Sequence, residues 1–187
     1  MRFDEFVVQH GLAVSPVNRF AGFLVEVGVP PGWKPFESAV GVRVWAWRAD
    51  PYIEKFCANA VLTMHQVEAA LDPAELFTML VHQQLQSVPR CRELHRELGP
   101  AGESVGVQGM LQMQIADELG TIDSASQTRV ITAGQETMIA QLTVTALHDS
   151  PVDRADVWLT VRPGATALPT SGGHRGGTPV TGTRDGH

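Results

Sequence analysis

The chain has 187 residues, a formal net charge of −6 and 43% hydrophobic residues. That length suits one domain, and that apolar content is enough for a hydrophobic core. The acidic balance without a basic stripe argues against a nucleic-acid partner and against an anionic membrane surface. We therefore expect a single domain over residues 1–163, followed by a disordered Gly/Thr/Pro-rich tail over residues 164–187, where large apolar side chains are scarce.

The N-terminal segment, MRFDEFVVQHGL, carries Asp4 and Glu5 where a secretory leader would have an apolar run. No stretch approaches the ~20 apolar residues that span a bilayer, and no cysteine lies near the N-terminus for lipid attachment. These features predict a cytoplasmic location without a membrane span. Cys57 and Cys91 lack metal-site spacing and are expected to be free thiols; a bridge between them would require Cα atoms within about 7 Å.

The first elements in chain order are a helix over residues 3–12 and a strand over residues 23–29. Phe3, Phe6 and Val7 recur at helical spacing, and Gly11 is a suitable C-cap. The strand runs into a Pro-Pro-Gly-Trp corner, where the prolines stop the ladder and the chain reverses. We expect Trp33 to fold back over this strand and close one end of the core.

Two strands and the clearest helix follow. Residues 42–47 and 59–67 alternate at period two, which places Arg43, Trp45 and Trp47 on one sheet face. Asp72, Pro73 and Glu75 satisfy three separate preferences for a helix start, at N-cap, N1 and N3. This pattern predicts a helix over residues 73–86 whose stripe packs on the sheet, consisting of Leu76, Phe77, Leu80, Val81 and Gln84.

The C-terminal half reads mainly as strands. Residues 91–98 are ambiguous between a helical turn and an edge strand. Beyond them the pattern has period two, with one face formed by Val105, Val107, Leu111, Met113 and Ile115, and the other by Gln108, Met110, Gln112 and Gln114. Strands over 127–132 and 137–147 complete an antiparallel meander through links at 121–126 and 134–135. Residues 152–161 are predicted to form a closing helix that buries Val157, Trp158 and Val161.

Together these helices and strands predict an α+β fold, a twisted antiparallel sheet of about six strands with helices packed on it. VPPGW at residues 29–33, DPAEL at residues 72–76 and the order of elements over about residues 3–161 give the chain a family resemblance. It resembles the LpqN/LpqT family of actinobacterial proteins, which is similar in fold to Mog1 and PsbP. The resemblance implies that relatives are typically secreted lipoproteins, that their roles are mostly docking onto other proteins, and that there are no catalytic residues to carry over.

No catalytic signature is present in the sequence. GxSxG, HExxH, Walker and GxGxxG motifs are absent, and the GGHRGG run at 172–177 lies in the tail. His65, His82 and His148 have no ligand spacing, so we expect neither a metal nor a cofactor. The sequence therefore predicts a protein that is not an enzyme, with a hydrolase of unrecognised site as a weaker alternative.

Two binding functions are consistent with this pattern. In the first, the protein is an adaptor module that docks onto a protein partner through Arg43, Trp45 and Trp47, because Trp and Arg are enriched at interface hot spots; burial of both tryptophans in the core is the competing interpretation. An uncharged face of Gln108, Gln112, Gln114 and Gln141 also suits a wet contact. In the second, a small apolar or amphiphilic ligand binds between helix and sheet, against a wall of Met64, Met79, Met110 and Met113.

Overall fold

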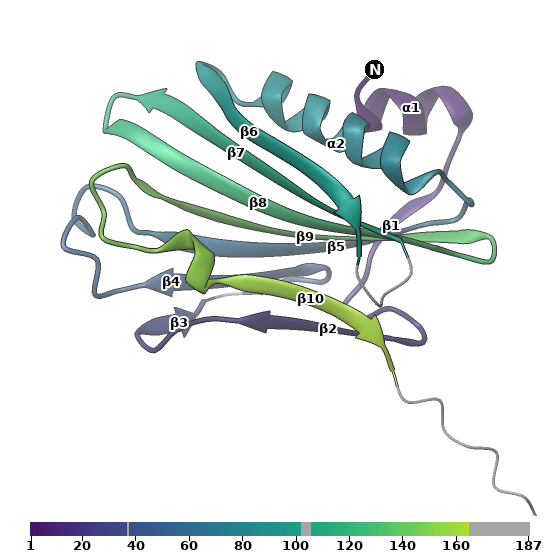
Figure 1. The fold of residues 1–187 in the computed structure, drawn as a ribbon, viewed down its shortest axis with the longest axis horizontal. Coiled ribbons are helices and arrows are strands. Elements are labelled where there is room, and N and C mark those ends of the chain that lie inside the picture. The colour runs from purple at the N-terminus through teal and green to yellow at the C-terminus, as the bar shows by residue number, and fades with distance from the viewer. Residues whose placement is uncertain (37, 102–105, 165–187) are drawn as a thin grey trace, which may run out of the picture.

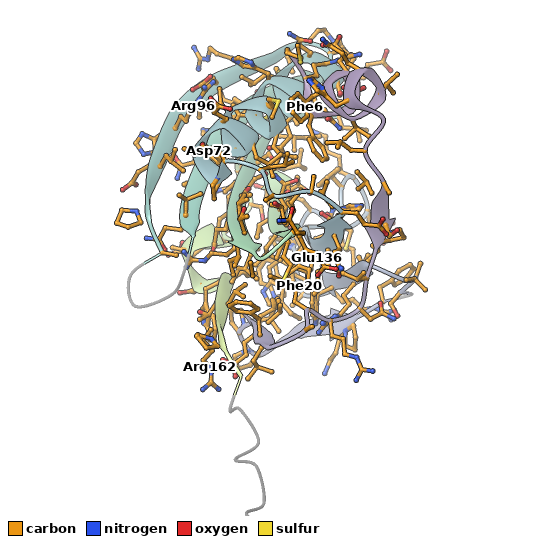
Figure 2. The ribbon with its side chains drawn as sticks, turned by 90° about the vertical axis from the view of Figure 1, so that its right-hand side faces the viewer. Phe6, Phe20, Asp72, Arg96, Glu136 and Arg162 are labelled. Atoms are coloured by element: carbon orange, nitrogen blue, oxygen red, sulfur yellow. The ribbon has the colours of Figure 1, made fainter. Side chains whose placement is uncertain are left out.

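The computed structural model describes residues 1–36, 38–101 and 106–164, which form three layers (Figure 1). Helices α1 (Phe3–His10) and α2 (Pro73–Ser87) cover one face of the main sheet. A two-stranded antiparallel ribbon of β2 (Phe23–Gly28) and β10 (Trp158–Pro163) covers the other. Figure 2 shows the same layering from the side. The fold is therefore α+β, two helices packed on an antiparallel sheet, as predicted.

Eight of the described strands form the main sheet, in the order β3-β4-β5-β9-β8-β7-β6 with β1 paired to β5. All its pairings are antiparallel. The strand bounds are β1 (Val14–Pro16), β3 (Trp33–Pro35), β4 (Val42–Trp47), β5 (Asn59–Val67), β6 (Cys91–Pro100), β7 (Val107–Asp117), β8 (Gly120–Ala133) and β9 (Glu136–Leu147). The sheet is larger than the predicted one of about six strands because short or polar segments, such as β1 and β6, also pair.

Local signals place both helices correctly. The Asp72 carboxylate accepts hydrogen bonds from the amides of Ala74 (3.0 Å) and Glu75 (2.8 Å), so α2 begins at Pro73 as predicted. Gly11 caps α1 in the left-handed region at φ 60°, where glycine has no steric penalty. The predicted stripe of α2 faces the sheet, with Leu76, Phe77 and Val81 buried.

The C-terminal half differs from the prediction in two places. β8 begins at Gly120, so residues 121–126 are strand and not a link; the turn lies before it, where Asp117 accepts from the Leu119 amide (3.0 Å). Residues 91–98 adopt the edge-strand alternative as part of β6. Val105, predicted to share a face with Val107, lies outside the described residues.

The closing helix predicted over residues 152–161 is wrong. A short 3-10 turn, Arg154–Asp156, leads into β10, which pairs with β2. Val157 and Val161 are buried as predicted, but Trp158 is 47% exposed because it points to the outer side of the ribbon, over Gly28. A β-carbon on Gly28 would collide with that indole ring. Gly164 is the last described residue, so the predicted tail lies otherwise outside the described chain.

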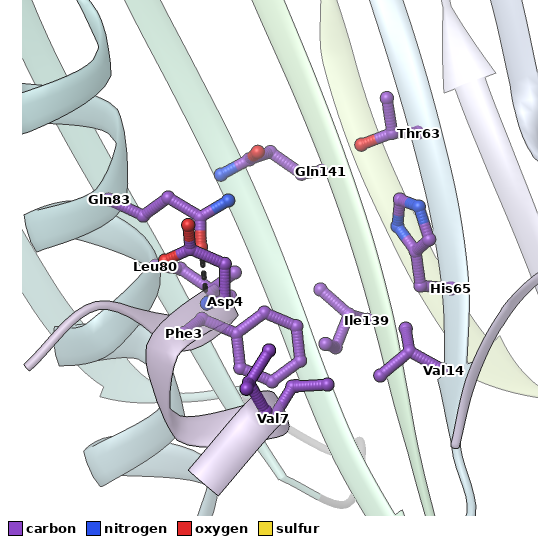
Figure 3. A pocket seen from close by; sticks show the side chains of 11 residues that line it. Phe3, Asp4, Val7, Val14, Thr63, His65, Leu80, Gln83, Ile139 and Gln141 are labelled. Atoms are coloured by element: carbon purple, nitrogen blue, oxygen red, sulfur yellow. Dashed lines mark hydrogen bonds between the residues drawn. The ribbon is translucent and has the colours of Figure 1, made fainter. Parts of the chain in front are cut away.

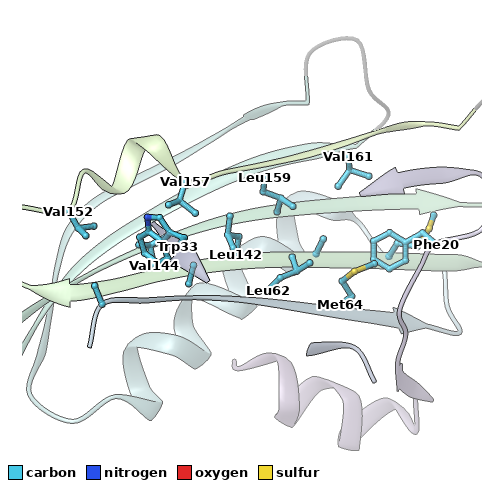
Figure 4. Packing of buried hydrophobic residues seen from close by; sticks show 14 of the residues in the cluster. Phe20, Trp33, Leu62, Met64, Leu142, Val144, Val152, Val157, Leu159 and Val161 are labelled. Atoms are coloured by element: carbon cyan, nitrogen blue, oxygen red, sulfur yellow. The ribbon is translucent and has the colours of Figure 1, made fainter. Parts of the chain in front are cut away.

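The largest core cluster lies between the main sheet and the ribbon (Figure 4). Leu62, Met64 and Leu142 from the sheet pack there with Leu159 and Val161 from β10. Trp33 is 8% exposed in the same cluster, which confirms its predicted place in the core. The apolar side of β9 therefore faces the ribbon, and its polar side faces the helices.

Candidate functional site

A cavity of about 380 Å³ lies between α1, α2 and the main sheet (Figure 3). Its volume falls within the roughly 300–1,000 Å³ that is usual for small-molecule sites. The lining comes from both helices and from β1, β5 and β9: Phe3, Asp4, Val7, Val8, Val14, Thr63, His65, Leu80, Gln83, Ile139 and Gln141. Residues far apart in sequence thus converge on one hollow.

One part of the cavity wall is apolar. Phe3 and Ile139 are buried, with 8% and 3% of their surfaces exposed, and belong to one core cluster. Val7, Val14 and Leu80 pack against that cluster and complete the apolar wall. Phe3 is the one buried residue of α1, so this short helix is held mainly by the contacts that also form the wall.

The remaining wall is polar and largely uncharged. Thr63, His65, Gln83 and Gln141 bring a hydroxyl, an imidazole and two amides to the cavity (Figure 3). The Asp4 amide donates to Gln83 Oε1 (2.9 Å), which ties α1 to α2. Gln141 Nε2 donates to Thr128 Oγ1 (3.1 Å). Within the described chain, no hydrogen bond uses Gln141 Oε1, the Thr63 hydroxyl or the His65 ring, so these groups are available to a ligand.

His65 presents a neutral imidazole to the cavity. Its ring points inward from β5, and burial lowers its pKa from the ordinary 6.5. Among the described residues that line the cavity, Asp4 is the one carboxylate and no lysine or arginine is present. The Arg2 guanidinium lies 3.2 Å from both Asp4 and Glu5, so it offsets the Asp4 charge only in part, and the lining carries at most one negative charge.

A satisfied polar network continues from the cavity along the sheet under α2. Gln84 Nε2 donates to Ser126 Oγ (3.0 Å), and that hydroxyl shares a hydrogen bond with Thr143 Oγ1 (2.9 Å). Gln141 Nε2 also reaches Gln84 Oε1 (3.4 Å). Ser126 is only 1% exposed, so these partners replace the water that it would otherwise bind.

The predicted contact residues lie on the opposite sheet face from this cavity. Arg43 is exposed, with Nη2 3.8 Å from Met64 Sδ. Trp45 and Trp47 are half-buried and pack against the cluster between the sheet and the ribbon. The ribbon, not the helices, covers this face. The structure therefore keeps the three residues together on β4 but separates them from the helix side of the sheet.

Two groups of residues that were predicted to share a surface do not do so in the structure. The four methionines do not form one wall, because Met64 belongs to the ribbon-side core whereas Met113 lies under α2. Gln141 does not share a face with Gln108, since its cross-strand neighbours Thr128 and Gly109 place it on the helix side. The alternation within β7 alone already places Met110 and Met113 on opposite faces. The case of Gln141 depends on register across three strands, which periodicity within one strand does not reveal.

Most of the residues that line the cavity are not among the site residues predicted from the sequence. His65 had been set aside for lack of metal-ligand spacing, and Gln83 lay outside the predicted stripe. The one available signal was the polar alternation of β9, with Gln141, Thr143 and Thr145 on a strand in the middle of a sheet. A central strand that is polar on a covered face indicates either a hydrogen-bonded network or a binding site.

In residues 1–36, 38–101 and 106–164, no group of three or more His, Cys, Asp or Glu side chains could hold a metal ion. Cys57 and Cys91 are free thiols, as predicted. Neither α1 nor α2 has the length and hydropathy to cross a membrane, and the same holds for every helix in these ranges.

A family model described as probable lipoprotein LpqN matches residues 1–165. The chain belongs to the LpqN family. Among solved structures, LpqN of Mycobacterium tuberculosis is 18% identical, with a TM-score of 0.71 over 87% of this chain and 98% of that one. This likeness shows a shared fold. That protein is described as involved in cell envelope biogenesis.

Two further solved structures are more distant. A Bacteroides thetaiotaomicron protein is 13% identical with a TM-score of 0.40, over 82% of this chain and 48% of that one. A mutant of the protein Mog1 is 13% identical with a TM-score of 0.42, over 73% of this chain and 80% of that one. No curated protein sequence matches the chain significantly.

The predicted cytoplasmic location is wrong. The family is one of probable lipoproteins, and its M. tuberculosis member is described as acting in cell envelope biogenesis, which implies an envelope location for the family. The prediction rested on the composition of the first twelve residues. Within that segment, Phe3–His10 form α1 with Gly11 as its C-cap, and Phe3, Asp4, Val7 and Val8 line the cavity, so its composition reflects the fold of the domain.

Proposed function

We propose that this protein binds a small amphiphilic ligand in the cavity between α1, α2 and the main sheet, as a non-catalytic carrier or receptor of the cell envelope. The observation that carries the proposal is the division of the cavity wall. Phe3, Val7, Val14, Leu80 and Ile139 offer apolar surface, and unpaired polar groups stand beside them. An amphiphile would gain burial of its apolar part at about 25 cal/mol per Å² while its polar part forms hydrogen bonds.

The electrostatics of the lining favour a ligand with an uncharged polar group. A carboxylate or phosphate head would find no cation in the lining, because His65 is neutral and Arg2 lies between the carboxylates of Asp4 and Glu5. A cationic head would have only the Asp4 carboxylate. Thr63, His65 and the amides of Gln83 and Gln141 supply both donors and acceptors, which suits hydroxyl or amide groups.

The direct test compares three amphiphiles with the same ten-carbon chain, used below their critical micelle concentrations. These are 1-monodecanoylglycerol, decanoate and decyltrimethylammonium. Isothermal titration calorimetry on the full chain should show saturable binding of the neutral probe, at least ten-fold tighter than of either ion. Equal affinity for all three would refute the preference for a neutral head, and no binding of any would refute the function.

A matched pair of variants on β1 locates the binding site. Val14 is half-buried and lines the cavity, whereas the next residue, Ser15, is exposed and points to the other side of the strand. Val14→Trp should fill the cavity and weaken binding of the neutral probe at least ten-fold. Ser15→Trp adds the same ring outside the cavity and should leave the affinity unchanged. Equal effects of the two substitutions would place the ligand elsewhere.

Docking onto a protein partner is our second proposal, and the surface around Arg43 favours it. Arg43 is exposed and lines an open hollow of about 570 Å³ with Asn18 and Val40, and the Val40 side chain is 59% exposed. A photo-crosslinking residue at position 40 should capture one discrete protein in the cell, and Arg43→Ala should abolish that adduct. Crosslinking indistinguishable from that at Leu24, which is exposed on the ribbon, would contradict this role.

Two substitutions on this surface distinguish an effect on partner binding from an effect on stability. Arg43→Ala removes an exposed side chain and should leave the unfolding free energy within about 0.5 kcal/mol. Trp45→Ala removes a half-buried ring that packs against the core cluster. It should cost about 2–3 kcal/mol, because truncating a fully buried Trp to Ala costs about 3–5 kcal/mol. A stable Trp45→Ala protein that no longer binds the partner would instead make this tryptophan part of the contact surface.

A further inference from the structure

A smaller hollow of about 160 Å³ lies among β6, β7 and β8. Its volume equals that of about five water molecules, at ~30 Å³ each. Its lining includes Glu97, Gln108, Met110, Gln127 and Arg129. Register places the last four on the sheet face that carries the ribbon, so this hollow is separate from the amphiphile cavity.

Arg129 is a half-buried cation without a carboxylate partner among the described residues. Its Nη1 donates to Gln108 Oε1 and its Nη2 donates to the Leu159 carbonyl (3.3 Å). Burial lowers the pKa of the guanidinium, and no neighbouring acid offsets that shift. Both acceptors are neutral, so the charge itself is not compensated within the described chain, which is costly for a partly desolvated group.

Glu97 lines the same hollow but does not neutralise Arg129. Its side chain is 75% exposed, and its carboxylate lies 3.8 Å from the His95 ring. A guanidinium has five N–H donors, of which the two hydrogen bonds use two. The Gln108 side-chain nitrogen also makes no hydrogen bond within the described chain. The hollow therefore combines an uncompensated charge with unused donors.

We infer that this hollow is a binding site for a small oxyanion, a phosphate or carboxylate group, whose counter-charge is Arg129. The planar guanidinium fork matches the oxygen spacing of both groups, and such charge-assisted hydrogen bonds are roughly twice as strong as neutral ones. The hollow has room for one such group and not for a drug-sized molecule. The oxyanion is either free in solution or carried by a larger molecule such as a lipid.

The test is a nuclear magnetic resonance titration of the ¹⁵N-labelled full chain, followed at the Arg129 Nε–H and at the side-chain amides of Gln108 and Gln127. Inorganic phosphate and dihexanoyl phosphatidic acid are the two probes, and sodium chloride of equal ionic strength is the control. We expect saturable shifts at these groups with at least one probe and none with chloride. A response to inorganic phosphate identifies a free anion, and a response confined to the lipid identifies a carried phosphate. Shifts no larger than with chloride for both would overturn the site.

Three variants assign the binding to Arg129. Arg129→Gln should weaken phosphate binding at least ten-fold. Gln108→Glu keeps the cation but places a carboxylate beside it, so it should also weaken binding at least ten-fold while raising the thermal midpoint, which covers the case in which Arg129→Gln fails to fold. Glu97→Gln removes a repulsive charge from the wall and should tighten binding. Affinity unchanged in Gln108→Glu would overturn the inference.

Discussion

Gly109 of β7 permits the close approach of α2 to the sheet, and adding one methyl group there tests this packing. A β-carbon at position 109 would overlap the ring of Phe77, which is only 2% exposed. Overpacking of this kind costs about 1–3 kcal/mol. Replacing glycine also restricts the unfolded chain, which returns about 0.4–1 kcal/mol. We therefore expect Gly109→Ala to lower the free energy of unfolding by up to about 2.6 kcal/mol.

Gly99 on the neighbouring strand provides the matched control, because a β-carbon there meets nothing within 4 Å. Gly99→Ala should be neutral or stabilise the protein by up to about 1 kcal/mol. Urea denaturation of both variants measures the difference directly. The loss of unfolding free energy in the double variant Phe77→Leu/Gly109→Ala should be smaller than the sum of the losses in the two single variants. The smaller side chain at position 77 relieves the overlap. Equal stability of Gly109→Ala and Gly99→Ala would refute this account of how α2 packs.

Two further predictions concern the helix cap and the cavity histidine. Asp72→Ala removes the acceptor for two backbone amides and should cost about 1 kcal/mol in urea denaturation, and a change below 0.3 kcal/mol would argue against the cap. Burial lowers the pKa of His65 below 6.5, so the unfolded chain binds its proton more readily and stability is lost as pH falls below that value. His65→Gln should remove this part of the acid loss, and stability curves parallel to wild type from pH 7 to pH 5 would contradict the assignment.

Short-range features of the sequence were predictable because their causes are local. Asp72 and Pro73 specify a helix start through groups within three residues of each other, and the stripe that includes Phe77 specifies its buried face. The alternation in β9 likewise separated Leu142 from Gln141 correctly. Such patterns depend only on the geometry of one helix or strand, so they do not depend on how the other elements are arranged.

Tertiary features were not predictable from these patterns. Residues 152–161 were predicted to form a helix, although the alternation of Val157, Leu159 and Val161 also fits a strand, and only the pairing with β2 decides between them. No local pattern states that a ribbon would cover the apolar face of β9 and that helices would cover the polar one. His65 lines the cavity only because this arrangement brings α1, β1 and β9 together around it.

The polarity of the helix-covered face bears on function because stability does not require it. A partly buried, hydrogen-bonded pair such as Ser126 and Thr143 contributes only about 0.5–1.5 kcal/mol net, and apolar replacement of both partners is often neutral or stabilising. An apolar surface under α2 would therefore hold the helix at least as well. The polar groups do change what the adjoining cavity can bind, since Gln141 belongs to both the network and the cavity wall. Ser126→Ala/Thr143→Val should thus leave stability near wild type but weaken binding of 1-monodecanoylglycerol, because Gln84 loses its acceptor Ser126 and then holds Gln141 less firmly. Unchanged affinity in a stable double variant would show that the network serves the fold alone.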